Sequence, residues 1–471
     1  MIPDRLEFLI ADDLPPRQLA DRFRASGHSL YLVGGSVRDA FLGRPVEDFD
    51  FTTSARPDTI LALLEGWADS VYTVGATFGT VAANKGGHSI EVTTFRDEIY
   101  RDDSRKPRVS YSDDIETDLS RRDFTVNSIA ISLPEMETVD PHGGLADLAA
   151  RRLRTPSDPE ISFSDDPLRM LRLFRFQASL GFDPAEEALA AVKSMGDRME
   201  IVSPERIRDE LNKLMVAPEP GAALLEMVEH RLTESFLPEL PALAMEQDPA
   251  HHHKDVLAHT AAVIDKTTPD LTLRLAALFH DVGKPETREF GPGGVSFHHH
   301  EVVGARLTRR RMKALRYPKD IIEDVASLVY LHLRPHTLAM GWTDSAVRRY
   351  VRDAGPLLER LNELVRCDVT TGNKRRESTI QGRIDELEER IRVLGAQEEL
   401  ARLRPPIDGN HVMEYLGIPP GPKVGEVMDL LLEKRIEDGP YPVGEAYEVV
   451  RQWAVAGGLD DPGPAPAWEE E

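Results

Sequence analysis

The sequence predicts an α+β head, built from a small mixed sheet with helices, followed by a long all-α body. Short segments rich in β-branched residues are confined to the first 150 residues or so. From about residue 160 onward, apolar residues recur at spacings of three and four, which is typical of helices. The chain has 471 residues, more than one hydrophobic core normally serves, so we expect three or four domains.

Each element is expected from a local pattern. The predicted strands are closed by Gly, Pro or Asn and lie at 30–35, 71–74, 80–85, 88–95 and 127–133, with a helix at 57–68. The predicted body helices lie at 168–180, 205–215, 221–230, 271–280, 302–315 and 321–332. From 380 to 394, Ile and Leu alternate spacings of four and three, which predicts the seam of a helical hairpin.

The composition limits the setting of the protein. The net charge of −24 argues against a nucleic-acid partner, but basic clusters interrupt the acidic background at 151–154, 169–175, 306–316 and 374–376. The single cysteine, Cys367, excludes a disulfide framework and favours the cytoplasm. The first residues lack the pattern of a signal peptide, and no apolar run approaches the roughly 18 residues that span a bilayer, so we expect no membrane association.

The segment LVGGSVRDAFLGRPVEDFDF, residues 32–51, carries the first chemical signal. Asp48 and Asp50 flank one phenylalanine, so on a strand they point the same way and their like charges require a cation. Mg²⁺ is the expected ion because it prefers oxygen ligands, and two such ions assist phosphoryl or nucleotidyl transfer. The residues expected to approach or bind a triphosphate precede them: Gly34, Gly35, Ser36 and Arg38.

This layout resembles the catalytic core of the polymerase-β-type nucleotidyltransferases. More closely, it resembles the class II group that contains tRNA CCA-adding enzymes and bacterial poly(A) polymerases. Residues 121–127, RRDFTVN, resemble the segment with which that family contacts ribose and phosphates. The resemblance therefore implies nucleotide-binding roles for Arg122, Asp123 and Asn127. Residues 205–214 resemble the last head motif of the family, which we expect to be mainly structural.

Residues 165–172, DDPLRMLR, resemble the EDxxR motif of the family, with Asp165 in place of Glu. We expect Asp166 to cap a helix that starts at Pro167, with Arg169 beside Asp166 on its surface. A carboxylate and a guanidinium match the edges of C and A. G and U would leave buried groups unpaired, at roughly 1–3 kcal/mol per group. The resemblance implies selection of CTP and ATP by this pair, with Arg172 in the same binding set.

Two further features of the head bear on the reaction. Glu91 lies on a predicted strand and is either a third acidic residue near the metal ions or part of a structural salt bridge. Residues 97–108 are polar and occupy the place of a flexible loop that full CCA-adding enzymes carry and CC-only enzymes lack. The resemblance therefore favours addition of the terminal A.

A second constellation lies in the helical body. His259, the adjacent His280 and Asp281, and Asp368 resemble the pattern of the HD phosphohydrolase superfamily. The resemblance implies a mixed nitrogen and oxygen site for one divalent ion, which activates water against phosphate esters. Ni, Co, Mn or Mg is the expected ion, and the histidines count against Mg alone.

The resemblance to the HD superfamily also implies roles for residues near this pattern. His300 best fits the family as a further ligand, and Lys284 is expected to hold a substrate phosphate. Similar HD proteins hydrolyse 2′,3′-cyclic phosphates or 2′-nucleotides. Four other histidines are expected to be structural: His251, His252, His332 and His336.

The motifs divide the chain into five predicted parts. These are a nucleotidyltransferase head at 1–150, a neck for base recognition and RNA binding at 151–245, an HD domain at 246–375, a helical tail at 376–458 and a disordered end at 459–471. Proline-rich breaks near 238–249 and 405–422 support such divisions.

The leading interpretation is template-independent addition of CCA to tRNA 3′ ends from CTP and ATP, with an attached HD phosphohydrolase. The basic clusters at 306–316 and 374–376 are expected to contact tRNA phosphates. An A-adding enzyme or a poly(A) polymerase shares the head motifs and stays an alternative. So does an HD phosphohydrolase whose head only binds RNA.

Overall fold

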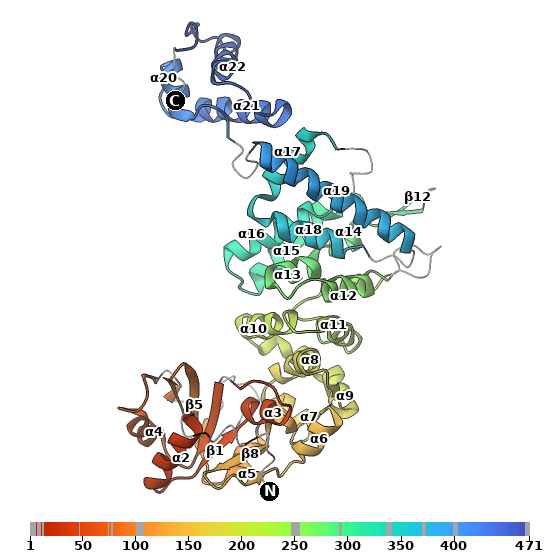
Figure 1. The fold of residues 1–471 in the computed structure, drawn as a ribbon. Helices are drawn as coiled ribbons and strands as arrows, with labels where there is room; N and C mark the ends of the chain where they lie inside the picture. The colour runs from red at the N-terminus through yellow and green to blue at the C-terminus, as the bar shows by residue number, and fades with distance from the viewer. Residues whose placement is uncertain are drawn as a thin grey trace. The chain divides into compact units, whose positions relative to one another are not determined.

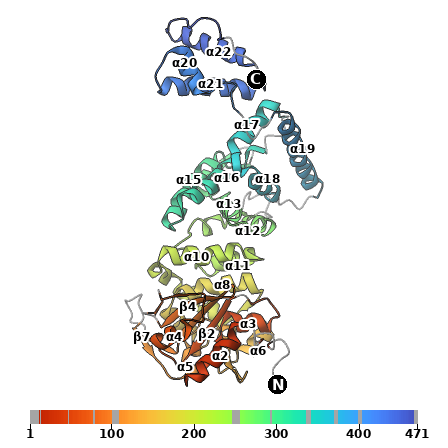
Figure 2. The same cartoon turned by 60° about the vertical axis from the view of Figure 1, so that its left-hand side comes forward.

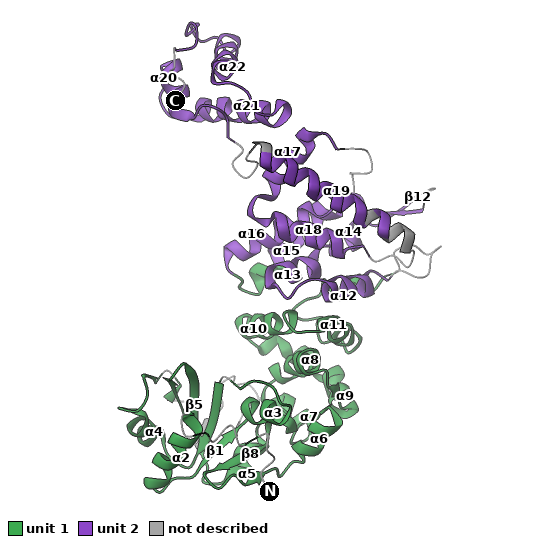
Figure 3. Cartoon of the chain, viewed as in Figure 1, with its two compact units in different colours: residues 1–245, 311–317 green, residues 246–310, 318–471 purple. Residues whose placement is uncertain are grey.

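The computed structural model describes residues 6, 11, 14–46, 48–73, 75–76, 79–99, 108–245, 255–291, 294–335, 342–369, 374–398 and 404–466. Its element order is shown in Figure 1. The chain forms two compact units, one of residues 1–245 with 311–317 and the other of residues 246–310 with 318–471 (Figure 3). Each unit is described by itself below.

The first unit begins with a seven-stranded sheet of order β3-β4-β5-β2-β1-β8-β9. Its strands are β1 (Leu30–Val33), β2 (Asp48–Thr53), β3 (Ser70–Tyr72), β4 (Thr80–Lys85), β5 (His88–Thr94), β8 (Ala130–Leu133) and β9 (Thr138–Val139). Strands β2 and β5 are parallel and the other neighbours are antiparallel. The predicted small mixed sheet is therefore confirmed.

Helices and one hairpin complete the head, whose sheet and helices Figure 2 shows from a second side. They are α2 (Pro15–Ala25), α3 (Gly35–Phe41), α4 (Pro57–Leu64), α5 (Ile115–Ser120), the 3₁₀ helix η3 (Thr125–Asn127) and α6 (Gly144–Ala150), with the hairpin β6 (Arg96–Ile99) and β7 (Arg108–Tyr111). The hairpin takes up both ends of the segment expected as a polar loop, while 100–107 lie outside the described residues. Helix α4 ends four residues before the predicted limit.

The two faces of the sheet differ in chemistry because side chains alternate along each strand. Phe49 and Phe51 of β2 and Ile90 of β5 enter one hydrophobic core with Phe23 of α2 and Ile60 of α4. The intervening residues of β2 and β5 therefore face the other way. This second face carries the acidic residues of the head.

Helices continue the first unit as α7 (Pro159–Asp165), α8 (Leu168–Leu180), α9 (Glu186–Met195), α10 (Pro204–Met215) and α11 (Pro220–Glu229), with η4 (Gly196–Ile201) and η5 (Pro241–Leu243). Helices α10 and α11 pack on α8, and α7 packs on α9. The predicted body helices are present within a residue or two. A two-stranded pair, β10 (Arg152–Leu153) with β11 (Asp183–Pro184), was not expected so far along the chain.

The second unit is almost entirely helical, as predicted. Its helices are α12 (Val256–Lys266), α13 (Leu271–Phe279), α14 (Lys284–Thr287), α15 (His300–Ala314), α16 (Lys319–Leu331), α17 (Asp344–Ala354), η7 (Gly355–Leu357), α18 (Leu358–Cys367), α19 (Lys374–Glu398), α20 (Gly409–Leu416), α21 (Pro422–Asp438) and α22 (Val443–Ala456). The last residues of α15 are grouped with the first unit. One hairpin, β12 (Glu289–Gly291) with β13 (Gly294–Ser296), is a strand pair that the sequence did not indicate.

The tail differs from expectation in two ways. The run from 380 to 394 lies on α19, one continuous helix that packs against α17 and α18, so the predicted division between 375 and 376 falls inside this helix. Within the predicted disordered end at 459–471, Asp461 pairs with Arg451 at 2.7 Å and Tyr415 donates to the Gly463 carbonyl at 2.6 Å. Residues 467–471 lie outside the described residues.

Among the described helices, none is both long and apolar enough to cross a lipid bilayer.

Candidate active site and metal centre

The acidic face of the sheet brings three carboxylates together on two neighbouring strands. In the parallel register of β2 and β5, Asp50 lies opposite Glu91, and Asp48 is two residues earlier on the same face. Burial raises the pKa of Asp50, and Asp48 raises it further, against the opposing effect of Arg122. Burial also raises the pKa of Glu91, with a smaller rise from each aspartate. The three carboxylates therefore share one electrostatic environment, and Glu91 forms no ion pair among the described residues.

Glycine is required where the chain turns from β1 into α3. Gly34 has φ +72°, and a Cβ there would lie 3.2 Å from an Arg122 nitrogen and 3.6 Å from an Asp50 oxygen. The backbone thus comes within contact distance of the carboxylate face, as the expected close approach to a triphosphate requires. Ser36 is 5% exposed and donates its hydroxyl to the Val33 carbonyl at 2.9 Å.

Arg38 belongs to a buried polar network. Its guanidinium donates to both carboxylate oxygens of Asp39 at 3.0 and 2.7 Å and to the Asn127 amide oxygen at 2.7 Å. Asn127 in turn donates to Asp123 at 2.9 Å. The structure therefore joins three residues that the sequence assigned to nucleotide binding, through contacts among themselves.

Asp123 is the centre of this network. Its second oxygen accepts from the Arg172 Nε at 2.9 Å. Burial alone would raise the pKa of Asp123, but Arg172 and the Asn127 amide together hold it well below its usual range. Arg172 of α8 was expected to belong to the base-binding set. In the structure its side chain joins α8 to Asp123, in the segment after α5.

Arg122 lies between the network and the carboxylates. Asp118, which is 0% exposed, accepts from Arg122 at 3.3 Å and from Arg121 at 2.7 Å. Burial raises the pKa of Asp118, but the two guanidinium groups outweigh that effect and lower it. The sequence reasoning missed Asp118 because nothing in the family motif marks a residue before 121.

The expected pairing of Asp166 with Arg169 is absent from the structure. Arg169 is 7% exposed and donates to the Ser162 hydroxyl at 2.8 Å and to the Arg121 carbonyl. Asp166 accepts from the Leu168 amide at 3.2 Å and pairs with Arg206 at 2.7 Å. The helix begins at Leu168, one residue later than predicted, with Pro167 as its N-cap.

Arg206 belongs to α10, whose segment 205–214 was expected to be mainly structural. The same helix supplies Glu210, which is 4% exposed and lies 3.0 Å from the Arg175 guanidinium and 3.6 Å from that of Arg172. Arg175 in turn stacks on Phe176, with 3.9 Å between the guanidinium carbon and the ring centroid. Sequence reasoning missed these contacts because they join residues about 30 to 40 positions apart.

The second unit gathers its predicted metal residues into one cluster. The His259 Nε2 lies 2.9 Å from an Asp368 oxygen and 3.2 Å from the His280 Nε2. One oxygen of Asp281 lies 3.3 Å from the His280 Nε2, and its other oxygen lies 3.5 Å from the His300 Nε2. Ligand-capable atoms thus form two groups, His259 with His280 and Asp368, and Asp281 with His300 and His332.

His332 was expected to be structural, and the structure places it in the second ligand-capable group, 1% exposed. Burial lowers its pKa to about 3, so the ring is neutral and offers a lone pair. The Nε2 atoms of His300 and His332 are both buried and have no hydrogen-bond partner among the described residues. Two orphaned nitrogens aimed at a carboxylate fit a bound cation. His251, His252 and His336 lie outside the described residues.

The histidine rings are oriented by backbone carbonyls three residues earlier. The Nδ1 atoms of His280, His300 and His332 lie 2.7, 2.9 and 2.6 Å from the carbonyls of residues 277, 297 and 329. A carbonyl only accepts, so in the neutral ring each Nδ1 carries the proton and each Nε2 is left as a ligand. A set of imidazole nitrogens and carboxylates suits transition metals such as Mn, Co and Ni.

Lys284 and three arginines of the 306–316 cluster form ion pairs within the protein. Lys284 donates to Asp281 at 2.6 Å, where a substrate phosphate contact was expected. In the 306–316 cluster, Arg306, Arg309 and Arg311 each pair with a glutamate at 2.7 to 2.9 Å. Three of the six basic side chains in this cluster are thus paired with carboxylates, and the side chains of 374–376 lie outside the described set.

Three family models match the chain. They are the poly A polymerase head domain over residues 30–154, "Probable RNA and SrmB- binding site of polymerase A" over 181–243, and the HD domain over 250–377.

Relatives match over most of the chain. The A-adding tRNA nucleotidyltransferase of Deinococcus radiodurans is 33% identical over 441 residues, 90% of this chain and 95% of that protein. The CCA-adding enzyme of Geobacillus thermodenitrificans is 31% identical over 409 residues, 86% of this chain and 88% of that protein. The crystal structure of the Bacillus stearothermophilus CCA-adding enzyme in complex with CTP shares the fold, with a TM-score of 0.64 and 23% identity over 94% of this chain and 99% of that one.

Proposed function

The chain belongs to the family of tRNA nucleotidyltransferases and poly(A) polymerases that carry an HD domain, and we propose that it adds CCA to tRNA 3′ ends from CTP and ATP. The observation that carries the proposal is the acidic face on β2 and β5. Asp48, Asp50 and Glu91 lie there beside the Gly34 turn and Arg122. We further propose that the reaction takes place in the cytoplasm.

In the proposed reaction, the 3′-hydroxyl of the RNA releases its proton to water, and its oxygen forms a bond to the α-phosphorus of the incoming nucleotide. The bond from that phosphorus to the oxygen that bridges to the β-phosphate breaks, and pyrophosphate leaves. Asp48 and Asp50 would hold Mg²⁺, which when bound neutralises charge on the attacking and leaving oxygens. Glu91 is positioned to add a third carboxylate. Arg122 places a positive charge at the Gly34 turn, where the backbone leaves room for the phosphates.

We propose Asp123, Asn127 and Arg38 as one preformed unit for the sugar and phosphates. Their mutual hydrogen bonds fix each side chain before a nucleotide arrives, which reduces the entropy lost on binding. Gly35 and Ser36 would shape the same pocket from α3.

We also propose that α8 selects the base through Asp166 and Arg169, with Arg172 holding the helix to the sugar-binding segment. Both reading residues lie in the first turn of α8 or just before it. Because Arg206 pairs with Asp166, a base would have to displace this arginine before its exocyclic amine could donate a hydrogen bond to the Asp166 carboxylate.

For the second unit we propose a metal-dependent phosphohydrolase that acts on phosphate esters at RNA ends, such as 2′,3′-cyclic phosphates. His259, His280, Asp281 and Asp368 would hold the ion, which when bound lowers the pKa of a water ligand. The locked imidazole rings support this assignment because the ligand atoms need no reorientation. His300 and His332 extend the donor set on the far oxygen of Asp281.

An A-adding enzyme is the main alternative, since the Deinococcus radiodurans relative carries that name and matches over nearly its whole length. A poly(A) polymerase would use the same head. An HD phosphohydrolase with a non-catalytic head is the alternative of another class, and the intact carboxylate face counts against it.

The deciding experiment uses tRNA transcripts that lack CCA, or end after the first or second C, with each nucleotide alone and in mixtures. Ordered incorporation of CTP and then ATP is expected. ATP incorporation alone, and only after CC, would overturn CCA addition in favour of A addition. Asp50→Ala should abolish incorporation and spare phosphate-ester hydrolysis, whereas His280→Ala should do the reverse. Incorporation by Asp50→Ala would overturn the assigned active site.

A further inference from the structure

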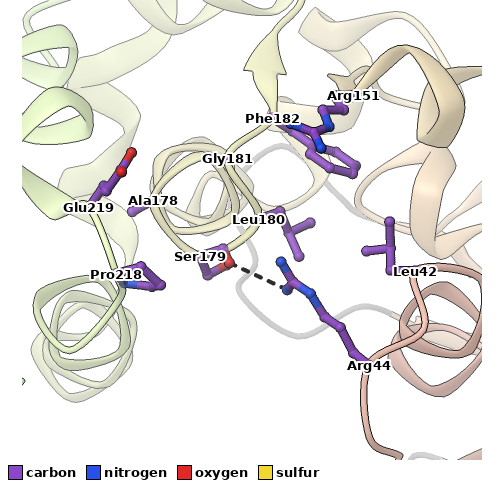
Figure 4. Close-up of a pocket in the computed structure, with 10 residues that line it drawn as sticks. All are labelled: Leu42, Arg44, Arg151, Ala178, Ser179, Leu180, Gly181, Phe182, Pro218 and Glu219. Atoms are coloured by element: carbon purple, nitrogen blue, oxygen red, sulfur yellow. Dashed lines mark hydrogen bonds between the residues drawn. The ribbon is translucent and has the colours of Figure 1, made fainter.

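A hollow of about 490 Å³ lies in the first unit, at the C-terminal end of α8 (Figure 4). It is lined from four places: the segment after α3, the end of α6, the end of α8 and the loop between α10 and α11. The feature that sets it apart is its charge. Two arginines, Arg44 and Arg151, line it in a chain whose net charge is −24.

Neither arginine is neutralised among the residues that the structure describes. Arg44 makes one long hydrogen bond, 3.4 Å, to the Ser179 carbonyl, which leaves most of its five N–H donors unused. The side chain of Arg151 makes no hydrogen bond or ion pair within the same described set. The next arginines along the chain differ, because Arg152 pairs with Glu187 at 3.0 Å and Arg154 with Asp147 at 2.8 Å.

The remaining walls suit a nucleotide unit of a strand. Leu42 and Leu180 supply partly exposed apolar surface that a ribose or base can cover, and Phe182 is buried beneath. Glu219 lies across the hollow from Arg44 in Figure 4. Its carboxylate opposes a highly charged triphosphate more strongly than a phosphodiester that carries a single negative charge.

We propose that this hollow binds a phosphodiester of the RNA substrate, with Arg44 and Arg151 as the phosphate-contacting residues. The inference rests on the proposed function, and it assigns to the RNA strand a place that the family motifs do not mark. A guanidinium donates two parallel hydrogen bonds to phosphate oxygens, which suits a phosphodiester. Residues 181–182 and 218–219 of its wall also fall within the stretch matched by the RNA-binding family model.

The position along α8 indicates which part of the RNA binds here. The proposed base-reading end of α8 and the hollow lie at opposite ends of a 13-residue helix, about 20 Å apart. The hollow would therefore hold a phosphate several nucleotides before the reacting 3′ end. It would fix the RNA without touching the incoming nucleotide.

The test compares Arg44→Ala, Arg151→Ala and the double variant with Arg152→Ala, the matched control outside the hollow. Affinity for tRNA lacking CCA is measured by fluorescence anisotropy over a range of salt concentrations. The double variant should bind tRNA about tenfold or more weakly, and its slope of log affinity against log salt should fall by about 1 to 2. The tRNA affinity and salt slope of Arg152→Ala should stay near those of the wild type. The KM for CTP should change neither in the double variant nor in Arg152→Ala.

Unchanged tRNA affinity and salt slope in the double variant would overturn the proposal. Should that variant fail to fold, Glu219→Gln provides a second test, since removing the opposing charge should tighten tRNA binding, and no change there would count against the hollow. Binding and nucleotide addition are separate readouts. A wild-type protein that adds no nucleotide refutes the proposed function, whereas altered RNA affinity in these variants tests the hollow alone.

Discussion

Asp118→Asn is predicted to destabilise the first unit strongly, although the residue lies outside every family motif. The side chain is 0% exposed and is shared by Arg121 and Arg122, which are 17% and 18% exposed. Removing one partner of a buried ion pair costs about 3–5 kcal/mol. Both arginines retain some access to water, so we take the lower end, about 3 kcal/mol. With a urea m value of about 2 kcal/mol per M, the midpoint should fall by about 1.5 M.

The assay follows Trp67, which lies in the first unit and donates to Gln18 at 2.8 Å. The other three tryptophans of the chain, at 342, 453 and 468, are replaced by phenylalanine so that urea unfolding monitored by fluorescence reports this unit. Asp113→Asn is the control, because its carboxylate is 86% exposed and pairs with an exposed arginine. That change should cost less than about 1 kcal/mol. Equal midpoint shifts for the two variants would refute the reasoning.

The direction in which pH changes the stability difference between the wild type and Asp118→Asn also follows from the structure. The folded pKa of Asp118 lies below its unfolded value, because the two arginines outweigh the effect of burial. A lowered folded pKa gives stability that is complete above the unfolded pKa of about 3.9 and is lost as pH falls towards the folded value. The gap in unfolding free energy between wild type and Asp118→Asn should therefore be full at pH 7 and smaller at pH 3. A constant gap would contradict the assignment.

Three further predictions concern the second unit. His332→Ala should lower the metal bound per chain, measured by mass spectrometry of the metal-loaded protein, whereas His230→Ala, which removes a similarly capped ring from the first unit, should not. Gly283→Ala should destabilise the protein by about 3 kcal/mol and lower the melting temperature, because the added Cβ would lie 2.1 Å from the His300 carbonyl oxygen. The control is Gly382→Ala, where the added Cβ meets no atom within 4 Å, and it should stabilise the protein by about 0.5–1 kcal/mol. Removing divalent ions with a chelator should lower the melting temperature of the second unit, and adding Mn or Ni back should restore it; no change in either step would exclude a resident ion.

The fold was predictable where local patterns decide it. The alternation around Phe49 and the spacing of apolar residues from 168 to 180 specify a strand and a helix without knowledge of the rest of the chain. The short pairs β10–β11 and β12–β13 were missed because each has only two or three residues a strand and depends on contacts made elsewhere. The end of the chain was expected to be disordered from its Pro and Gly content, yet Tyr415 holds Gly463 in place.

Several predicted site residues contact one another in the structure, but the sequence did not predict which of them make contact. Motif spacing selected Asp123, Asn127 and Arg172, but it could not show that they contact one another across about 50 residues of chain. It expected Arg169 to meet Asp166, since residues three apart are neighbours on a helix surface. The pairing failed because Asp166 lies before the helix begins, and Arg169 is drawn instead to carbonyl and hydroxyl groups of α7 and the turn after α5.

The position of His332 beside Asp281 could not be predicted from its local sequence. His280 and His332 are both C-cap residues of helices, and each ring satisfies a carbonyl that has no amide partner in its last turn. His230 caps α11 in a related way: its Nδ1 lies 2.9 Å from the Glu226 carbonyl, which also accepts from the His230 amide. The local sequence therefore does not distinguish His280 and His332 from His230. Only tertiary packing places the first two beside Asp281, while His230 lies outside the ligand-capable groups found among the described residues. A histidine at a helix C-cap has an oriented Nε2, and we expect that nitrogen to bind an ion only where a carboxylate such as Asp281 lies beside it.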